Sequence, residues 1–275
     1  MKRHIFHYSI SEVVPYIDWN YLLHAWGIPG NGTAEATSTE IKRDAKAILE
    51  REGDKFRTHA LSAICEARGN GDDIIIEGTA IPFLRQQHAR TGCPNMCLSD
   101  FISPHGDTIG LFATTVDSGF GNEYAQDPYL SLLSQTLADR LAEATACLMH
   151  RQIRTDGNIW GYYPDEKASI EDLLHERHQG IRPAVGYPSL PDQSIIFNIG
   201  HLLELDRIGI TLTPNGAMSP HASVCGMMFA HPQACYFSIG RISEEQLADY
   251  AERRGMTTEE IRKFLTKNID MPHNG

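Results

Sequence analysis

A hairpin signal between residues 57 and 77 is the feature that most constrains the fold. Ala60-Leu61-Ser62-Ala63-Ile64-Cys65 is typical of a strand, and so is Asp73-Ile74-Ile75-Ile76-Glu77. Between them, Gly69-Asn70-Gly71-Asp72 has the composition of a tight turn. Two strands joined by so short a turn pair antiparallel. Because no strand–helix–strand unit repeats along the chain, we expect an α+β fold around an antiparallel sheet rather than a doubly wound parallel sheet.

Hydrophobic spacing predicts the remaining elements. The longest is a helix over residues 129–154, in which Leu133, Leu137 and Leu141 share one face. Other helices are predicted over two pieces of 11–26 that break near Asp18, and over 39–52, 81–89, 169–177, 195–203, 243–254 and 257–265. Other strands are predicted over 109–116, 208–213, 223–229 and 235–242, with 98–103 as sheet or turn. We expect one domain over residues 1–275, with an N-terminal helical arm at 1–35 and an α+β body at 36–275.

The charge balance argues against a nucleic-acid partner. The chain has 24 Lys and Arg against 35 Asp and Glu, a formal net charge of −11, and no run of basic residues. No apolar stretch approaches the roughly 20 residues that span a bilayer, so we expect no membrane association. The start, Met1-Lys2-Arg3-His4-Ile5-Phe6-His7-Tyr8, lacks the apolar region of a signal peptide.

Cysteine and histidine spacing indicates no metal site. Among the six cysteines only Cys93 and Cys97 lie close together, and their three-residue gap fits neither redox Cys-x-x-Cys chemistry nor a zinc knuckle. Free thiols in a reduced, cytoplasmic protein are the better interpretation. None of the 13 histidines forms a spaced pair on one helix face, so surface or core histidines are expected. Dinucleotide, phosphate-loop and serine-hydrolase motifs are also missing.

The segment Arg182-Pro183-Ala184-Val185-Gly186-Tyr187-Pro188 suggests a site for an anion. A planar guanidinium on a loop stiffened by two prolines suits capture of a carboxylate. Gly186 has no Cβ and lets the loop pass close to a ligand, and Tyr187 adds a flat apolar face with a hydroxyl at its tip. Taken without its neighbours, the pattern is equally consistent with a surface turn.

Motifs along almost the whole chain resemble, in order, the reactivation domain of cobalamin-dependent methionine synthase. The hallmark is Gly180-Ile181-Arg182-Pro183-Ala184-Val185-Gly186-Tyr187-Pro188. The other matching segments are Tyr16-Ile17-Asp18-Trp19 with Trp26, Gly71-Asp72-Asp73-Ile74, Phe83-Leu84-Arg85-Gln86-Gln87, Cys97-Leu98-Ser99-Asp100-Phe101, Leu137-Ala138-Asp139-Arg140-Leu141-Ala142-Glu143-Ala144, Trp160-Gly161-Tyr162 and Tyr250-Ala251-Glu252-Arg253-Arg254-Gly255-Met256. A collinear set of this extent does not arise by chance.

The resemblance implies both a fold and an activity. The fold is a C-shaped α+β domain with a central twisted antiparallel sheet flanked by helices. Members bind S-adenosylmethionine and dock over a cobalamin-carrying domain whose cofactor has been oxidised to cob(II)alamin. An electron from a flavodoxin-like donor and a methyl group from S-adenosylmethionine then regenerate methylcobalamin. The implied cofactors are S-adenosylmethionine and a cobalamin supplied by the partner, the cobalamin-binding module of methionine synthase.

The resemblance also implies roles for particular residues. Asp18 would accept a hydrogen bond from the ligand's α-amino group, and Arg182 would hold its carboxylate. The backbone at Ala184 and Gly186 would contact the adenosine part, and Tyr187 would face the reaction zone beside the corrin. The aromatic pair Tyr236 and Phe237 would line the nucleoside, and Glu143 and Glu176 would supply further carboxylates.

Four of these residues have a simpler alternative. Asp18 also suits the N-cap of the second short helix. Glu143 lies in a long helix, where a glutamate is by default a solvated surface residue. Tyr236 and Phe237, if they lie on a strand, would ordinarily belong to the core.

The sequence departs from the family pattern at several points. Gln193 stands where the family has a histidine, and glutamine does not titrate near neutral pH. The family's Met-Trp-Pro has become Met218-Ser219-Pro220, and its Gly-Trp-Tyr-Phe has become Gly226-Met227-Met228-Phe229. The cobalamin-binding signature Asp-x-His-x-x-Gly is absent, because Ser103-Pro104-His105-Gly106-Asp107 does not fit it.

Two functional hypotheses follow from the sequence. The first is a free-standing reactivation component of cobalamin-dependent methionine synthase, a methyltransferase, that meets its corrinoid partner in trans. The second is a module that binds S-adenosylmethionine as a sensor, or as a chaperone of another corrinoid protein, without reactivation chemistry. The lost histidine and aromatic residues favour the second hypothesis modestly.

Overall fold

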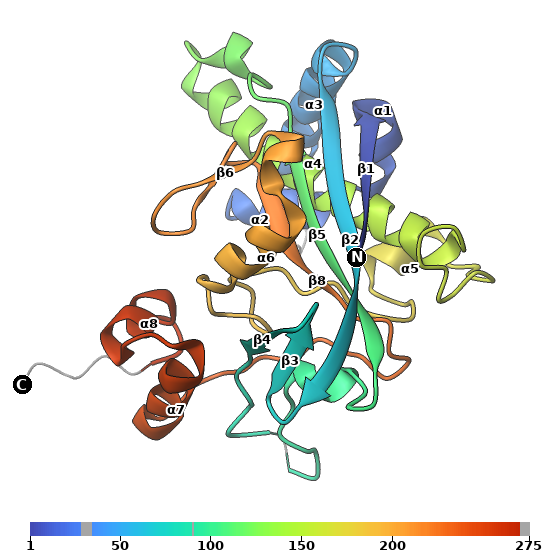
Figure 1. The fold of residues 1–275 in the computed structure, drawn as a ribbon. Helices are drawn as coiled ribbons and strands as arrows, with labels where there is room; N and C mark the ends of the chain where they lie inside the picture. The colour runs from blue at the N-terminus through green and yellow to red at the C-terminus, as the bar shows by residue number, and fades with distance from the viewer. Residues whose placement is uncertain (29–34, 90, 270–275) are drawn as a thin grey trace, which may run out of the picture.

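The computed structural model describes residues 1–28, 35–89 and 91–269, which form an antiparallel sheet with helices on both faces (Figure 1). Within the described residues the main sheet has six strands: β1 (Lys2–Ser9), β2 (Arg57–Asn70), β3 (Asp73–Ile76), β4 (Thr79–Pro82), β5 (Asp107–Val116) and β8 (Ser223–Met228). Their order is β4-β3-β2-β5-β8. The long strand β2 pairs with β1 along its first half and with β3 along its end. Strands β6 (Thr211–Leu212) and β7 (Met218–Ser219) form a separate small ribbon.

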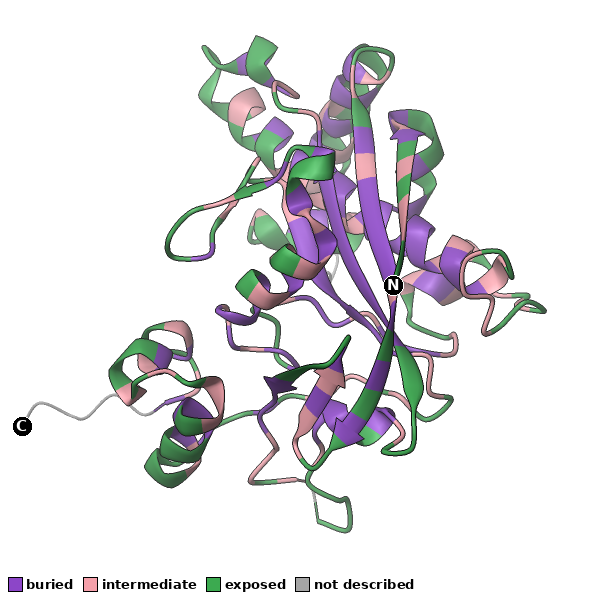
Figure 2. Cartoon of the chain, viewed as in Figure 1, coloured by how far each residue is buried: buried purple, intermediate pink, exposed green. Residues whose placement is uncertain are grey.

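The helices are α1 (Ile10–Val13), α2 (Trp19–Ala25), α3 (Glu35–Glu52), α4 (Pro128–Thr155), α5 (Ile170–Leu174), α6 (Ile195–Leu203), α7 (Glu244–Arg254) and α8 (Thr258–Phe264). Single 3₁₀ turns occur at Val14–Tyr16, Leu98–Phe101, Asn122–Tyr124 and Leu205–Ile208. None of the described helices is both long and apolar enough to cross a bilayer. The helices bury the sheet from both sides, as the coloured cartoon shows (Figure 2).

Strand β5 shows how the two cores are divided. Phe112 points into one core together with α4 and the N-terminal helices, whereas Leu111 and Ala113 point into the other, which contains α6. This alternation is the expected geometry of a strand. Because both faces are covered, eight consecutive residues of β5 are buried, which explains its largely apolar sequence. A third, smaller core holds α7 and α8 together and includes Leu84.

The predicted hairpin, the central strand and the long helix are all confirmed. Strands β2 and β3 pair across the predicted turn, and β5 covers the predicted 109–116. Helix α4 begins after the N-cap Asp127, whose side chain accepts hydrogen bonds from two backbone amides. Helices α7 and α8 begin after Ser243 and Thr257, as their capping signals indicated. The predicted α+β architecture around an antiparallel sheet is therefore correct.

Three local predictions are wrong. Residues 81–89 form no helix, because Thr79–Pro82 is the edge strand β4, which returns along β3 after Gly78 adopts a left-handed φ of 84°. Residues 235–242 form no strand. The N-terminal segment predicted as helical begins instead with β1, which pairs with β2 over eight residues. The boundary drawn at residue 35 stays a prediction.

Candidate ligand-binding site

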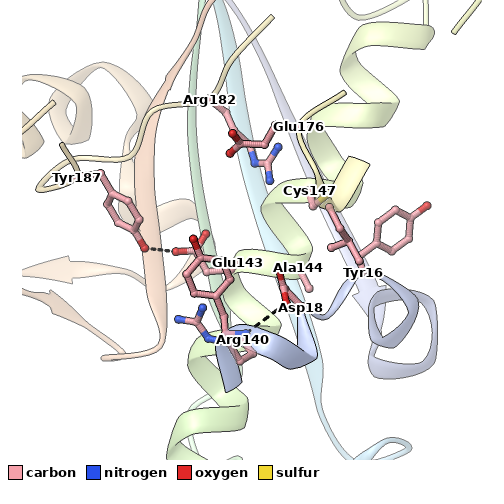
Figure 3. A pocket seen from close by; sticks show the side chains of 11 residues that line it. Tyr16, Asp18, Arg140, Glu143, Ala144, Cys147, Glu176, Arg182 and Tyr187 are labelled. Carbon is pink, nitrogen blue, oxygen red and sulfur yellow. Dashed lines mark hydrogen bonds between the residues drawn. The ribbon is translucent and has the colours of Figure 1, made fainter. Parts of the chain in front are cut away.

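Three adjoining cavities lie beside α4 and the segment 182–189. The first, here called the Asp18 cavity, has a volume of about 290 Å³ and is shown in Figure 3. The second, the Tyr236 cavity, has a volume of about 540 Å³, and the third, the His221 cavity, about 230 Å³. Glu143 and Tyr187 line all three cavities. The three spaces therefore belong to one site that meets at this pair.

The segment that carries Arg182 runs antiparallel to β8 and is fixed by backbone hydrogen bonds. Ile181 and Phe229 exchange both of their N–H···O bonds, at 3.0 and 2.9 Å. Further along, the Met227 amide donates to Pro183 O at 3.0 Å and the Val185 amide to Cys225 O at 2.9 Å. The loop thus behaves as an irregular extra strand at the free edge of the sheet, and its backbone position is set by β8.

Gly226 allows this close approach. A Cβ added at residue 226 would lie 2.3 Å from Pro183 O and 2.8 Å from the Cα of Ala184. Gly186, at a left-handed φ of 85°, then turns the chain back, and its amide donates to Leu190 O at 2.8 Å. Glycine is favoured at such a φ because it has no Cβ. Gly186 forms this turn and is not among the residues that line the three cavities.

Arg182 presents a partly buried cation to the Asp18 and Tyr236 cavities. Its backbone amide donates to the hydroxyl of Tyr236 at 2.9 Å. Its guanidinium Nη1 is buried and has no hydrogen-bond partner among the described residues. Burial opposes the charged form, but nearby Cys147, Tyr236 and two glutamates outweigh it and raise the pKa of Arg182. An unpaired buried donor is costly, so the site is suited to an anionic ligand group.

Asp18 lines the same cavity and also caps a helix. Its Oδ1 accepts hydrogen bonds from the amides of Asn20, at 2.9 Å, and Tyr21, at 3.2 Å, at the start of α2. The structural alternative for Asp18 is therefore correct, and it does not compete with a place in the site. The cap fixes the carboxylate at the wall of the cavity.

Glu143 reaches the site from the middle of α4. Its carboxylate accepts a hydrogen bond from the hydroxyl of Tyr187 (Figure 3). Partial burial, followed by the nearby Glu143, raises the pKa of Tyr187, so its hydroxyl stays protonated and serves as the donor. Glu143 is therefore not a solvated surface residue.

Glu176 lies just beyond the C-terminus of α5 in a left-handed conformation, with φ at 57°. The amide of Glu176 donates to Leu173 O at 3.2 Å, and the amide of Arg177 donates to Asp172 O at 2.8 Å. These two bonds define a Schellman motif, whose left-handed position is usually occupied by glycine. Burial raises the pKa of the Glu176 carboxyl and Arg182 opposes that shift. The strained backbone thus holds a partly desolvated carboxyl beside the arginine.

Tyr236 and Phe237 lie at the far side of the site and line the Tyr236 cavity together with Ala184. Their segment is fixed to the loop rather than to a strand. The Phe237 amide donates to Ser189 Oγ at 3.0 Å, and the Ile239 amide donates to Pro188 O at 2.9 Å. Both aromatic side chains are only partly buried, so each keeps a face toward the cavity.

All of the predicted site residues except Gly186 therefore line the same site, although they come from five separate parts of the chain. Sequence reasoning missed Tyr16 and Tyr21, which flank Asp18, and also Arg140 and Cys147. Helical spacing contained the signal for the last two, because they lie three residues before and four residues after Glu143 on α4. Gln193 lies behind the turn, where its amide donates to Gly216 O at 3.4 Å.

Comparison with known proteins identifies this kind of domain. The structure superimposes on the crystal structure of the MetH reactivation domain bound to AdoHcy with a TM-score of 0.90 and 32% sequence identity. The match covers 98% of this chain and 91% of the other. It agrees with the α+β fold expected from the resemblance. The fold is thus that of a methionine synthase reactivation domain.

Residues 9–255 match the family described as vitamin B12 dependent methionine synthase, activation domain. The chain belongs to this family. The matched range includes every residue to which the sequence assigned a role, from Asp18 to Phe237.

Proposed function

We propose that this protein binds S-adenosylmethionine and supports reductive methylation of cob(II)alamin on a cobalamin-dependent methionine synthase. The observation that carries the proposal is the guanidinium of Arg182, whose buried Nη1 has no partner among the described residues and which lines cavities that also hold carboxylates and an aromatic pair. S-adenosylmethionine has a carboxylate, an amino cation, a sulfonium and a nucleoside, and each has a matching group in the site. The family relationship and the AdoHcy bound by the similar structure support the same ligand.

In this proposal the ligand extends across two cavities. Arg182 holds the ligand's carboxylate by charge-assisted hydrogen bonds, and Asp18 accepts from its amino group. Tyr236 and Phe237 pack against the adenine, and the backbone of Ala184 contacts the adenosine part, on a loop that turns back at Gly186. Glu143 and Glu176 add negative charge between these ends. Tyr187, which is 47% exposed, faces the side from which a corrin would approach.

In this reaction the protein's role is to position the reactants rather than to transfer protons. S-adenosylmethionine supplies a methyl group, and a one-electron donor of the flavodoxin type supplies the reducing equivalent. Displacement at a methyl carbon needs alignment and exclusion of water, but no general acid or base. The site accordingly has charged and aromatic groups suited to binding. Tyr187 and Glu143 orient each other at the open side.

We expect the corrinoid to reach the site from a module outside residues 1–275, carried on a separate polypeptide. No Asp-x-His-x-x-Gly signature occurs in the sequence. Mixing the purified chain with a methionine synthase that ends after its cobalamin module and carries cob(II)alamin, together with S-adenosylmethionine and a reduced flavodoxin, tests this expectation. Formation of methylcobalamin, followed by absorbance, supports reactivation in trans.

Calorimetric titration tests ligand binding directly. Wild-type protein should bind S-adenosylmethionine, and Arg182→Ala should weaken binding by about 100-fold, since a charge-assisted pair contributes roughly 3 kcal/mol. Arg177→Ala is the matched control, because Arg177 is 64% exposed and pairs with Asp172 outside the cavities. Absence of binding by the wild type would contradict the proposal. Unchanged binding by Arg182→Ala would show that the carboxylate lies elsewhere.

A second candidate function is a sensor or chaperone that binds S-adenosylmethionine without reactivation chemistry. The substitutions at Gln193 and Ser219 favour it, because they remove a titratable group and an aromatic ring that the family carries next to the site. The two functions separate in the trans assay. Ligand binding without methylcobalamin formation by the wild type, restored by Gln193→His, would favour the sensor.

A further inference from the structure

The carboxylate of Glu143 lies where the three cavities meet. The Asp18 cavity holds Asp18 and Arg182, which suit the amino acid end of the proposed ligand, whereas the Tyr236 cavity holds the aromatic pair. In S-adenosylmethionine the sulfonium joins the amino acid part to the nucleoside. A ligand that extends from one cavity to the other therefore brings its sulfonium to their junction, which Glu143 and Tyr187 line together with Glu176 and Arg182.

The charge of the Asp18 cavity also matches a cationic ligand. Its lining has three carboxylates, on Asp18, Glu143 and Glu176, and two guanidinium groups, on Arg140 and Arg182. One carboxylate is in excess. S-adenosylmethionine carries a net charge of +1 at neutral pH, and its demethylated product, S-adenosylhomocysteine, carries none. The methylated ligand neutralises the site, whereas the product leaves one negative charge unpaired.

Among these three carboxylates, Glu143 is the one that lines all three cavities and so lies where they meet. Asp18 uses Oδ1 to cap α2. Glu143 and Glu176 both interact with the guanidinium of Arg182, so this contact does not distinguish them. Glu143 accepts its hydrogen bond from a neutral donor, the hydroxyl of Tyr187, which orients the carboxylate without cancelling its charge. The ring of Tyr187 offers a further surface that attracts a cation.

We propose that Glu143 determines the ligand preference of this site by recognising the sulfonium charge. The inference rests on the proposed function and deepens it. When the methyl group leaves, the positive charge disappears and the attraction of Glu143 is lost, so the product binds more weakly and can be exchanged. Tyr187 acts as the positioning residue for this carboxylate.

Three ligands test the proposal on the wild-type protein by calorimetry. They are S-adenosylmethionine, S-adenosylhomocysteine, and sinefungin, in which a carbon bearing an ammonium group replaces the sulfonium. The two cationic ligands should bind about tenfold more tightly than the neutral product, and added salt should narrow the difference. Equal affinities for all three would overturn the inference. If none of the three ligands binds, that result would instead contradict the proposed function.

Substitution of Glu143 separates recognition of charge from general binding. Glu143→Gln should weaken the binding of S-adenosylmethionine by about tenfold and leave the affinity for S-adenosylhomocysteine within about twofold of that of the wild type. Glu143→Asp keeps the charge and should keep the preference. Glu245→Gln, an exposed glutamate on α7, changes the net charge equally and should change neither affinity. A preference that persists in Glu143→Gln, or an equal loss of both ligands, would refute the assignment.

Discussion

The two walls of the site are built by different physical means. The loop wall, residues 181–190, carries Arg182 and is held by backbone hydrogen bonds to β8. The helix-end wall carries Asp18 at the start of α2 and Glu176 just beyond the end of α5. The cation is thus positioned by the sheet, and two of the carboxylates by helix termini.

Because of this difference, we expect substitutions in the two walls to affect folding stability and ligand affinity to different extents. The loop wall depends on many backbone hydrogen bonds and on close packing against β8. A substitution that disturbs it should therefore cause a large loss of folding stability, even when the substituted residue lies outside the loop. Helix caps contribute about 1 kcal/mol each, so the helix-end wall can lose a carboxylate and stay folded.

Asp192 should be the residue whose loss harms the loop wall most. It is 1% exposed and accepts a 2.7 Å hydrogen bond from Tyr250, and its carboxylate lies 3.5 Å from Nε of Arg254. Asp192→Ala leaves a buried cation without its counter-charge and should destabilise the fold by about 3–5 kcal/mol, measured by urea denaturation.

Asp249→Ala is the control for Asp192→Ala, because Asp249 lies on the same helix as Tyr250 but is 61% exposed in its pair with Arg253. It should cost less than about 1 kcal/mol. Similar losses in the two variants would show that the contacts of Asp192 with α7 do not anchor the loop.

Gly226→Ala should displace the loop from β8. The added Cβ would meet the backbone of Pro183 and Ala184, which cannot move without breaking the ladder. We expect a loss of about 1–3 kcal/mol in stability and weaker S-adenosylmethionine binding, measured by thermal denaturation and calorimetry. Gly157→Ala, where nothing lies within 4 Å of the added Cβ, should alter neither. Wild-type affinity in Gly226→Ala would mean that the loop wall adjusts freely.

The sequence predicted the centre of the sheet better than its edges. Strands β2, β3 and β5 follow from apolar runs and a tight turn, since both faces of β5 are buried. Strand β1 is half exposed and rich in basic and histidine residues, so its pattern gave no signal until β2 provided a partner. Residues 235–242 have the aromatic composition of a strand, but their amides bind the loop at Pro188 and Ser189 instead. Tertiary contacts decided both cases.

The site was predictable as a set of residues but not as a shape. Motif positions supplied Asp18, Arg182, Tyr187 and Tyr236, and the structure places these in adjoining cavities. The three cavities meet at Glu143 because segments distant in the sequence pack together there. The spacing of residues along one helix gives no information about this packing. The glycine needed at residue 226 likewise becomes evident only from the approach of the loop.

Asp18 and Asp127 allow the helix-end wall to be tested with a matched pair. Each is an N-cap whose Oδ1 accepts two backbone amides, but only Asp18 lines the site. Asp18→Ala and Asp127→Ala should each cost about 1 kcal/mol of stability. Only Asp18→Ala should also weaken the binding of S-adenosylmethionine, by roughly tenfold as measured by calorimetry. Equal affinities in the two variants would place the amino group away from Asp18.

Glu176→Gly should have the smallest effect on stability, and it should be favourable. Residue 176 occupies the left-handed position of a Schellman motif, where glycine is adopted without strain, so the variant should gain up to about 1 kcal/mol in urea denaturation. The same change removes a carboxylate from beside Arg182 and should weaken the binding of S-adenosylmethionine several-fold.

Glu204→Gly is the control for this trade, because Glu204 also has a left-handed φ, of 62°, but lies at the end of α6, outside the cavities. It loses ion pairs with Arg3 and Arg207, so its gain in stability should be smaller, and its affinity for the ligand should be unchanged. If Glu176→Gly gained stability and kept full affinity, the strained glutamate would have no role in binding. Opposite signs for stability and affinity would show that the helix-end wall retains a strained residue for the sake of its carboxylate.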